Sequence, residues 1–330
     1  MKPLIKKLTE TFSPSGYENA IREVITDEIK DFADEIRVDA LGNLIARKGS
    51  GGKKIMIAAH MDEIGLIVNH VDEKGFARFS PLGTFLPHTL VGARVRFLNG
   101  AYGVVGAEYL KKETQTKLAP LDKMFIDTGA TSPKDSPVKI GDVAALERPF
   151  HDLGKRLIAK SMDNRVSVAV LIETMRKLKT TAHEVYFVFT TQEEVQVRGA
   201  ITSAFGIAPE IGIAIDICPV GDTPDSAKKE VSLGKGVSIK IKDPLMIADP
   251  RIVTWMIKAA EKANIPYQRE VSTLGSTDAR AIQVAGAGAM VGGISIPCRY
   301  VHSPSEMVDY DDVQNTVKLL ITLLEKKIEL

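Results

Sequence analysis

Short apolar runs that end in polar or charged residues are the feature of this sequence that most constrains its fold. Continuous runs of this kind are typical of strands that are buried on both faces of a sheet. The four examples are residues 55–59 before His60 and Asp62, residues 185–190 before Glu193 and Glu194, residues 211–215 before Asp216, and residues 290–296 before His302. Because ligands bind at the carboxyl edge of open α/β sheets, these polar side chains are expected to meet at one edge.

Segments with helical spacing alternate with these runs. Apolar side chains recur at helical spacing in residues 5–12 and 21–29, and residues 166–179 and 252–263 are also predicted to be helical. Residues 281–297 are largely apolar but include several glycines and a glutamine, so they are interpreted as buried strand and loop, not as a membrane span. The alternation of helices and buried strands predicts an α/β sandwich.

The pattern of apolar and turn-forming residues changes between residues 66 and 159. Short β-like runs are broken there by Gly, Pro and Asn-Gly, which is typical of a small all-β unit. The runs are residues 89–97, 103–105 and 138–146. We predict that residues 66–159 form an inserted β domain, so that the α/β domain consists of residues 1–65 and 160–330.

Composition excludes several kinds of partner. The 330 residues carry a formal net charge of +1, and no block of Lys and Arg has interleaved aromatic residues, so nucleic acid is not an expected partner. The two cysteines, Cys218 and Cys298, are too few to cross-link a chain of this size and indicate free thiols in a reducing compartment. The amino terminus lacks a continuous apolar stretch of signal-peptide length, so a cytoplasmic location without a membrane partner is expected.

The polar residues at the strand ends suggest a metal site. A fifth one, Asp163, lies where a helix is predicted to begin. Each has an ordinary explanation when taken singly, since a lone histidine after a strand is commonly structural, Asp163 is a good helix N-cap and adjacent glutamates are usually solvated. Together, two histidines and three carboxylates form a nitrogen and oxygen donor set that suits Zn²⁺ or Co²⁺. The predicted ligands are His60, Asp163, Glu194, Asp216 and His302.

Charge balance indicates two metal ions and leaves two residues for other roles. Two divalent ions are neutralised by Asp163, Glu194 and Asp216 together with one hydroxide, which is tolerable in a partly buried site. Glu193 is then free to act as the general base of a hydrolytic reaction. Asp62 is placed to accept the second N–H of His60 and to fix the tautomer of that imidazole.

Seven short motifs, which occur in order along nearly the whole chain, carry a family resemblance. They are Ser13-Pro14-Ser15-Gly16, Leu41-Gly42-Asn43-Leu44, His60-Met61-Asp62-Glu63-Ile64-Gly65, Met162-Asp163-Asn164-Arg165, Gln192-Glu193-Glu194-Val195, Thr277-Asp278-Ala279 and Arg299-Tyr300-Val301-His302-Ser303-Pro304. The sequence resembles the cocatalytic metallo-aminopeptidases of the glutamyl/deblocking type, whose larger members form tetrahedral particles and which are often labelled cellulase-like.

This resemblance implies a role for each predicted site residue. His60 and Asp216 would bind one metal ion, Glu194 and His302 the other, and Asp163 would bridge them. The mechanism expected from these roles places the free α-amino group of a peptide on one metal ion. The metal ions polarise the scissile carbonyl. Glu193 takes a proton from the bridging water and delivers it to the leaving amine.

The resemblance also carries expectations for architecture and assembly. It implies a three-layer sandwich with a mixed central sheet, like that of zinc peptidases, and a β-barrel-like insertion between the first motif with His60 and the bridging Asp163. It further implies homo-oligomers, from dimers to a dodecameric cage. Within the insertion, Phe85, Leu86 and Leu90 are candidates for burial between subunits, or alternatively for the core of the small domain itself.

Two positions depart from the family pattern, and a third position lies near a predicted ligand. Gln196 stands where such enzymes usually have a backbone-permissive glycine, which puts loop shape and substrate preference in question. Ser276 replaces a second common glycine, which is a milder change. Cys218 shares a strand face with Asp216, but the ligand set is complete without it, so it is interpreted as a small core residue.

Three rival functions stay open at this point. A glycoside hydrolase would need two facing carboxyls but has no use for His60 and His302 at the same edge, and it would survive a chelator. A dipeptidase, carboxypeptidase or deacylase with the same metals would be distinguished by comparing peptides with free and blocked amino termini. A non-catalytic interaction protein is disfavoured because every expected ligand and the base are present.

Overall fold

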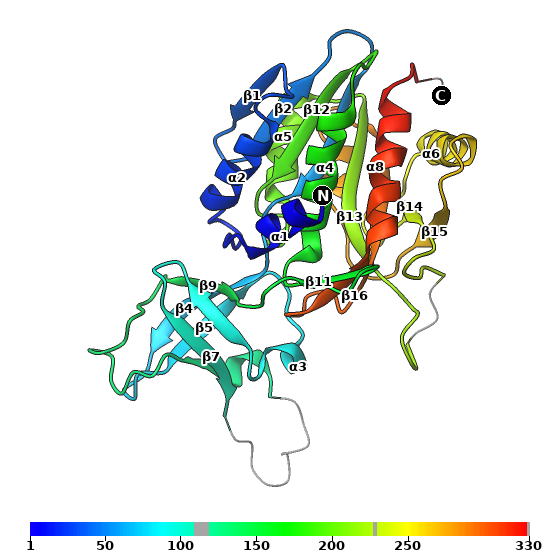
Figure 1. The fold of residues 1–330 in the computed structure, drawn as a ribbon. Coiled ribbons are helices and arrows are strands. Elements are labelled where there is room, and N and C mark those ends of the chain that lie inside the picture. Colours follow the sequence, from blue (N-terminus) through cyan, green and yellow to red (C-terminus); the bar gives the residue numbers. More distant parts are fainter. Residues whose placement is uncertain (109–118, 227–229, 329–330) are drawn as a thin grey trace.

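An eleven-stranded mixed sheet forms the centre of the larger part of the molecule, which we call the body (Figure 1). The computed structural model describes residues 1–108, 119–226 and 230–328. Along the main path of the sheet the strands are β1 (Glu35–Val38), β2 (Leu44–Lys48), β12 (Glu184–Thr190), β3 (Lys54–His60), β13 (Ile211–Pro219), β16 (Met290–Arg299), β17 (Glu306–Asp309), β11 (Arg156–Ala159) and β10 (His151–Asp152). Off this path, β14 (Val237–Lys242) pairs with both β16 and β15 (Tyr267–Val271).

Four adjacent strands in the middle of this sheet run parallel. They are β12, β3, β13 and β16, which pair in that order. Their interiors are buried, as expected for parallel strands that are covered on both faces, and this explains why they are nearly continuous apolar runs in the sequence. Their carboxyl ends therefore lie at one edge of the sheet.

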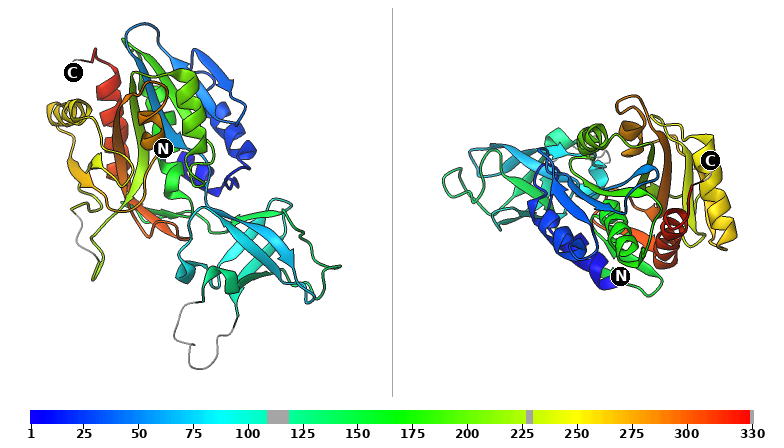
Figure 2. Two further views of the ribbon diagram at one scale, coloured as in Figure 1. Left: turned by 180° about the vertical axis from the view of Figure 1, so that it is seen from behind. Right: turned by 90° about the horizontal axis from the view of Figure 1, so that it is seen from above.

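Helices cover both faces of the sheet, so the body has three layers (Figure 2). On one face α4 packs against β3 and β13 and also contacts α1, α2 and α8, while α5 and α7 pack on the other face. The helices are α1 (Lys2–Glu10), α2 (Asn19–Ile29), α4 (Met162–Lys177), α5 (Arg198–Ile207), α6 (Pro250–Lys262), α7 (Ala279–Gln283) and α8 (Tyr310–Leu324). Within the described residues, none of the helices has both the length and the apolar character needed to cross a membrane.

A closed β-barrel projects from the end of the body at which β3 leads into β4 (Figure 1). Its strands, in the order in which they pair, are β4 (Gly65–Val71), β5 (Ala77–Leu82), β8 (Met124–Asp127), β7 (Tyr102–Ala107), β6 (Arg94–Phe97) and β9 (Val143–Leu146). It also contains the short helix α3 (Pro87–Leu90) and a 3₁₀ turn at Leu121–Lys123. The barrel has its own apolar core, distinct from that of the body. The predicted α/β sandwich with a mixed sheet and an added β-barrel is confirmed.

Several local predictions were wrong at their boundaries. The β-like run of residues 89–97 begins instead with α3, because Pro87 at the first helical position pre-sets its backbone, and only Arg94–Phe97 is a strand. Of residues 138–146, only Val143–Leu146 is a strand. Residues 281–297 include the end of helix α7 before strand β16 begins at Met290.

Candidate metal centre

The structure brings the five predicted ligands together at the carboxyl edge of the four parallel strands. His60 is the last residue of β3, and His302 lies in the turn between β16 and β17. Glu194 lies in the loop after β12, and Asp163 lies in the first turn of α4. Asp216 does not follow its strand as predicted, because β13 continues past it to Pro219.

These side chains form two groups that share one carboxylate. His60, Asp163 and Asp216 offer donor atoms that lie within 4.8 Å of one another, and so do Asp163, Glu194 and His302. The Nε2 atom of His60 is 3.0 Å from Oδ1 of Asp163 and 3.9 Å from Oδ1 of Asp216. The Nε2 atom of His302 is 3.3 Å from Oδ2 of Asp163 and 3.5 Å from Oε2 of Glu194. The two oxygens of Asp163 thus face different groups.

Glu193 lies beside the first group without belonging to either. Its Oε2 atom is 4.0 Å from Nε2 of His60. Burial raises the pKa of Glu193 well above its ordinary value, and the negative charges of Asp216 and Glu194 contribute to this increase. Burial likewise raises the pKa of Asp216 well above its ordinary value and raises that of Glu194.

The two histidines respond to the same charges in the opposite sense. Burial alone would lower the pKa of His302, but the carboxylates of Glu194 and Asp163 raise it to about 12. For His60 too, burial acts to lower the pKa, but the carboxylates of Asp163 and Asp62 hold it well above its usual value. The site therefore holds more buried negative charge than its two imidazoles can neutralise, which is costly unless cations are bound.

The donor set fits divalent metal ions. Four carboxylates converge with two imidazoles, and these side chains are buried or nearly so except that of His302, which is 23% exposed. Nitrogen and oxygen donors in this combination suit Zn²⁺ and Co²⁺. Each of the two groups offers three protein donors, the number that is usual in catalytic sites, which keep a position open for water or substrate. A shared carboxylate between them is the arrangement expected of a dinuclear centre.

Comparison with known proteins identifies the family. The model of the family described as M42 glutamyl aminopeptidase matches residues 42–319. The chain belongs to the M42 glutamyl aminopeptidase family. It is 47% identical over 324 residues to a putative aminopeptidase of Acetivibrio thermocellus, covering 97% of each chain. Members of this family are metal-dependent hydrolases, and the chain is accordingly a metal-dependent aminopeptidase.

Solved structures agree with this placement. The aminopeptidase APDkam598 of Desulfurococcus kamchatkensis is 39% identical, with 98% of this chain and 94% of that chain covered and a TM-score of 0.93. The TET1 peptidase of Pyrococcus horikoshii, which can assemble into a tetrahedron or a large octahedral shell, is 34% identical, with 98% and 99% covered and a TM-score of 0.90. The family resemblance inferred from the sequence is thus confirmed.

Asp62 makes more contacts in this M42 chain than its spacing from His60 predicts. Its Oδ1 atom is 3.3 Å from Nδ1 of His60, and this carboxylate is fully buried. It also accepts the backbone N–H of Glu193 at 3.1 Å and of Glu194 at 3.2 Å. The hydroxyl of Ser15 donates to its Oδ2 atom at 2.6 Å. Asp62 therefore orients one histidine and the start of the glutamate-bearing loop together.

A second anchor for this loop comes from Asn43 of the Leu-Gly-Asn-Leu motif. Its Oδ1 atom accepts the N–H of Thr191 at 2.9 Å, and its Nδ2 group donates to the carbonyl of Gly199 at 3.0 Å. A Cβ atom on Gly199 would lie 2.2 Å from Oδ1 of Asn43 and 2.4 Å from the carbonyl oxygen of Thr191, so no larger residue fits there. Both ends of the loop are thereby tied to β2.

Gln196, the departure from the M42 pattern, keeps the backbone conformation that a glycine would adopt. Its φ is 88°, in the left-handed region that L-residues disfavour. Its Oε1 atom accepts a hydrogen bond from the guanidinium of Arg280 at 3.0 Å. Gln196 thus has a positive φ without being a glycine, and its side chain contacts α7.

The barrel also reaches the site, which the sequence did not indicate. Gly83, which follows β5, has a φ of 88°, and a Cβ atom there would lie 3.2 Å from Oε2 of Glu194. The hydroxyl of Thr89 in α3 is 3.5 Å from the backbone carbonyl of His302. Of the predicted interface residues, Phe85 and Leu90 belong to the barrel core, whereas Leu86 is 45% exposed.

Sequence reasoning missed several buried residues around the centre. Glu306 accepts backbone N–H groups from two of the predicted ligands. Glu63 forms buried ion pairs with Lys160 and Arg165 next to Asp62 and Asp163. The signal available was weak, since a carboxylate in a polar stretch is usually solvated. Cys218 is a buried free thiol and belongs to neither donor group among the described residues.

Proposed function

We propose that this aminopeptidase removes amino-terminal residues from peptides by using two divalent metal ions, with Glu193 as the general base. His60 and Asp216 would hold one ion, Glu194 and His302 the other, and Asp163 would bridge them. The observation that carries this proposal is the pair of donor groups that share Asp163, with Glu193 beside them and in neither group. Zn²⁺ and Co²⁺ are the ions that suit these donors.

The protein residues have different roles in the reaction. The two ions, when bound, would supply Lewis-acid catalysis of amide hydrolysis. Glu193 would accept a proton from the attacking water at a carboxylate oxygen and return it to the leaving amine. Asp62 would keep Nε2 of His60 directed at the metal ion through the 3.3 Å contact of its Oδ1 atom with Nδ1, and it would hold the backbone of Glu193 in place.

Neighbouring glutamates with different roles give a direct test. Glu193→Gln should retain two metal ions per chain but lose about 10² to 10⁴ in turnover, because the lost group is the base. Glu194→Gln should lose metal as well as activity, because the lost group is a ligand. Metal content and turnover of both variants check this, and the reverse pattern would contradict the roles assigned here.

Metal and substrate dependence test the rest of the proposal. A chelator should abolish activity, and added Zn²⁺ or Co²⁺ should restore it. Fully active protein that contains fewer than about one ion per chain would contradict a dinuclear centre. Peptides with free amino termini should be cleaved and their acetylated counterparts should not, whereas a deacylase or carboxypeptidase would accept a blocked amino terminus.

We also propose that copies of the chain associate through the barrel. The barrel carries exposed apolar side chains, among them Leu98, Tyr102 and Ile140, and exposed apolar surface is typical of sites of protein–protein contact. The similar TET1 peptidase can assemble into a tetrahedron or a large octahedral shell. A cytoplasmic location is part of the same proposal, because Cys218 and Cys298 are free thiols.

A further inference from the structure

Glu306 connects two of the proposed ligands through their backbones. It is the first residue of β17, and its side chain is buried, with 2% of the residue exposed. Its Oε2 atom accepts the backbone N–H of Asp163 at 2.9 Å, and its Oε1 atom accepts the backbone N–H of His302 at 2.7 Å. The two carboxylate oxygens of Glu306 therefore accept hydrogen bonds from Asp163 and His302, which lie far apart in the sequence.

The two backbone positions differ in conformation, and only that of His302 is disfavoured. His302 has a φ of 60°, which is the left-handed region that non-glycine residues disfavour. Asp163 lies at the start of α4 but has a ψ of 104°, so its backbone is not helical there. The conformation of His302 persists only where the surroundings hold it, whereas that of Asp163 is an ordinary extended one. The carboxylate of Glu306 supports His302 and fixes the N–H of Asp163, which the extended backbone leaves outside the regular helix.

We propose that Glu306 is a positioning residue that sets the spacing of Asp163 and His302 for the metal ion between them. The proposal rests on the ligand roles assigned above. Glu306 belongs to neither donor group, and it acts by fixing the N–H groups of two residues whose side chains do. His302 belongs only to the group with Glu194, so this group should depend on Glu306 more than the group with His60.

A carboxylate is required because it can accept at both oxygens. In Glu306→Gln the side chain could accept only one of the two N–H groups, and its amide N–H would oppose the other. In Glu306→Asp both oxygens remain, but the shorter side chain cannot reach both donors at once. Both variants should therefore displace Asp163 or His302.

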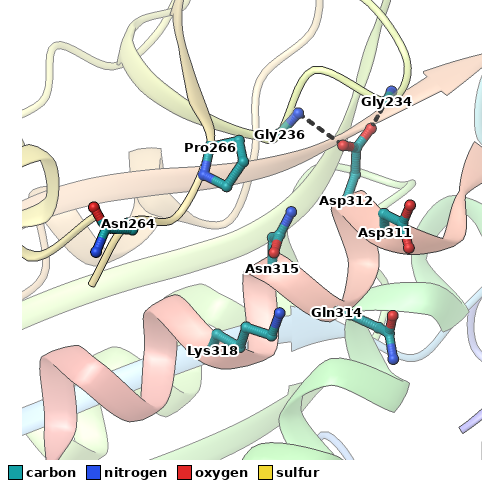
Figure 3. Close-up of a pocket in the computed structure, with 9 residues that line it drawn as sticks. All are labelled: Gly234, Gly236, Asn264, Pro266, Asp311, Asp312, Gln314, Asn315 and Lys318. Atoms are coloured by element: carbon teal, nitrogen blue, oxygen red, sulfur yellow. Dashed lines mark hydrogen bonds between the residues drawn. The ribbon is translucent and has the colours of Figure 1, made fainter. Parts of the chain in front are cut away.

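The structure contains a matched control for this arrangement. Asp312 in α8 is also buried, and its two oxygens accept the backbone N–H of Gly234 at 2.6 Å and of Gly236 at 2.8 Å (Figure 3). It lines a pocket of about 350 Å³ that shares no residue with the metal centre. Asp312→Asn therefore removes the same kind of contact at a place where no metal ligand depends on it.

The experiment compares zinc binding by full-length wild type, Glu306→Gln, Glu306→Asp and Asp312→Asn. Stepwise Zn²⁺ affinity is measured by competition with a chelator, and thermal unfolding of the metal-free proteins is measured in parallel. Glu306→Gln should weaken binding of one of the two ions about 10- to 100-fold, as is typical for residues that orient metal ligands. Asp312→Asn should lower the unfolding temperature but leave both affinities within about twofold of wild type.

The outcomes separate a positioning role from a merely structural one. Zn²⁺ affinities of Glu306→Gln that equal those of Asp312→Asn would overturn the proposal, whatever the loss of stability. If Glu306→Gln does not fold, Glu306→Asp decides, because wild-type affinity in that variant would also overturn it. Wild type that binds no Zn²⁺ would instead refute the dinuclear centre itself, so the two failures are distinguishable.

Discussion

The body and the barrel bury different kinds of side chain. Among the described residues, none of the polar or charged residues that are buried as a whole lies between residues 65 and 146, which span the barrel strands. The body, in contrast, buries charged residues in numbers, including Glu63, Lys160 and Arg165 as well as the metal-centre carboxylates. Because buried charge is costly unless it is paired, the body must provide partners or bound cations for these groups, whereas the barrel has no such requirement.

The charged network around Glu63 shows how the body manages this cost. Lys160 and Ser161 donate to Oε2 of Glu63, and Ser13 donates its N–H to Oε1 at 2.8 Å. Arg165 lies 3.5 Å from the same carboxylate and donates to the carbonyl of Leu8 at 2.8 Å. The network thus connects α1 and the loop after it to Glu63, which follows Asp62 in the sequence. It also connects them to Lys160 and Arg165, which lie before and after Asp163 in the sequence. The barrel needs no such network, because its core is apolar.

The largest effect on stability is expected from unpairing this network. Lys160→Met leaves Glu63 buried without its ammonium partner, and loss of one partner of a buried ion pair typically costs about 3 to 5 kcal/mol. Denaturant unfolding should show this loss, and metal content should fall because Asp163 is close by. The matched change in the barrel is Ile126→Ala at a fully buried site, which should cost about 2 to 5 kcal/mol but leave metal content unchanged.

Either of two results would weaken the comparison between body and barrel. Lys160→Met with wild-type stability would show that Arg165 and Ser161 compensate fully for the missing charge. Ile126→Ala with reduced metal content would show that the barrel core supports the centre, in addition to the close approach of Gly83 to Glu194.

The sequence predicted the parts of this molecule that depend on local patterns. Strands such as residues 55–59 and 185–190 were correct because a strand buried on both faces must be apolar throughout. His60 and Glu194 were brought together with the other predicted ligands because parallel strands place their carboxyl ends at one edge. The rule needed only the order of the strands, not their exact ends.

What the sequence could not predict depends on contacts between distant segments. Glu306 has no pattern of its own, and its importance arises only when β17 places it beside Asp163 and His302. Helix α3 was missed because four residues are too few for a helical period to be visible. Phe85 and Leu90 could equally be core or interface from sequence alone, since burial is a property of the folded barrel.

A smaller effect is expected from pH at a histidine of the body that directly precedes β12, at the opposite end of this strand from Glu194. His183 is buried, its Nδ1 atom accepts the N–H of Lys53 at 3.2 Å, and its Nε2 atom is 3.2 Å from the carbonyl of Lys326. Burial lowers the pKa of His183, and Lys53 and Lys327 act in the same direction, while the hydrogen bond to the carbonyl of Lys326 and the charge of Glu210 oppose them. The folded protein therefore favours the neutral imidazole.

The sign of the pH dependence follows from this shift. Below the ordinary histidine pKa of about 6.5, the unfolded chain binds a proton that the folded chain resists. The stabilisation from His183 is thus complete above that pH and is lost as pH falls through it. The free energy of unfolding of wild type, relative to that of His183→Gln, should be larger at pH 8 than at pH 5.5. A difference that is constant or larger at low pH would show that His183 is not held neutral.

The smallest effect on stability, and the sharpest test of the difference between the two regions, is expected at the barrel surface. Tyr102 and Val104 alternate with buried neighbours along β7 and are 56% and 45% exposed. Tyr102→Ser combined with Val104→Thr should change the free energy of unfolding by no more than about 0.5 kcal/mol per site, as is usual for surface changes. It should weaken self-association, which sedimentation measures, because these side chains belong to the face proposed for contact.

Phe205→Ser is the control, since this residue of α5 is 75% exposed but belongs to the body. Dissociation by Phe205→Ser alone would place the interface on the body, and wild type that sediments as a monomer at micromolar concentration would refute self-association while leaving the metal centre unaffected.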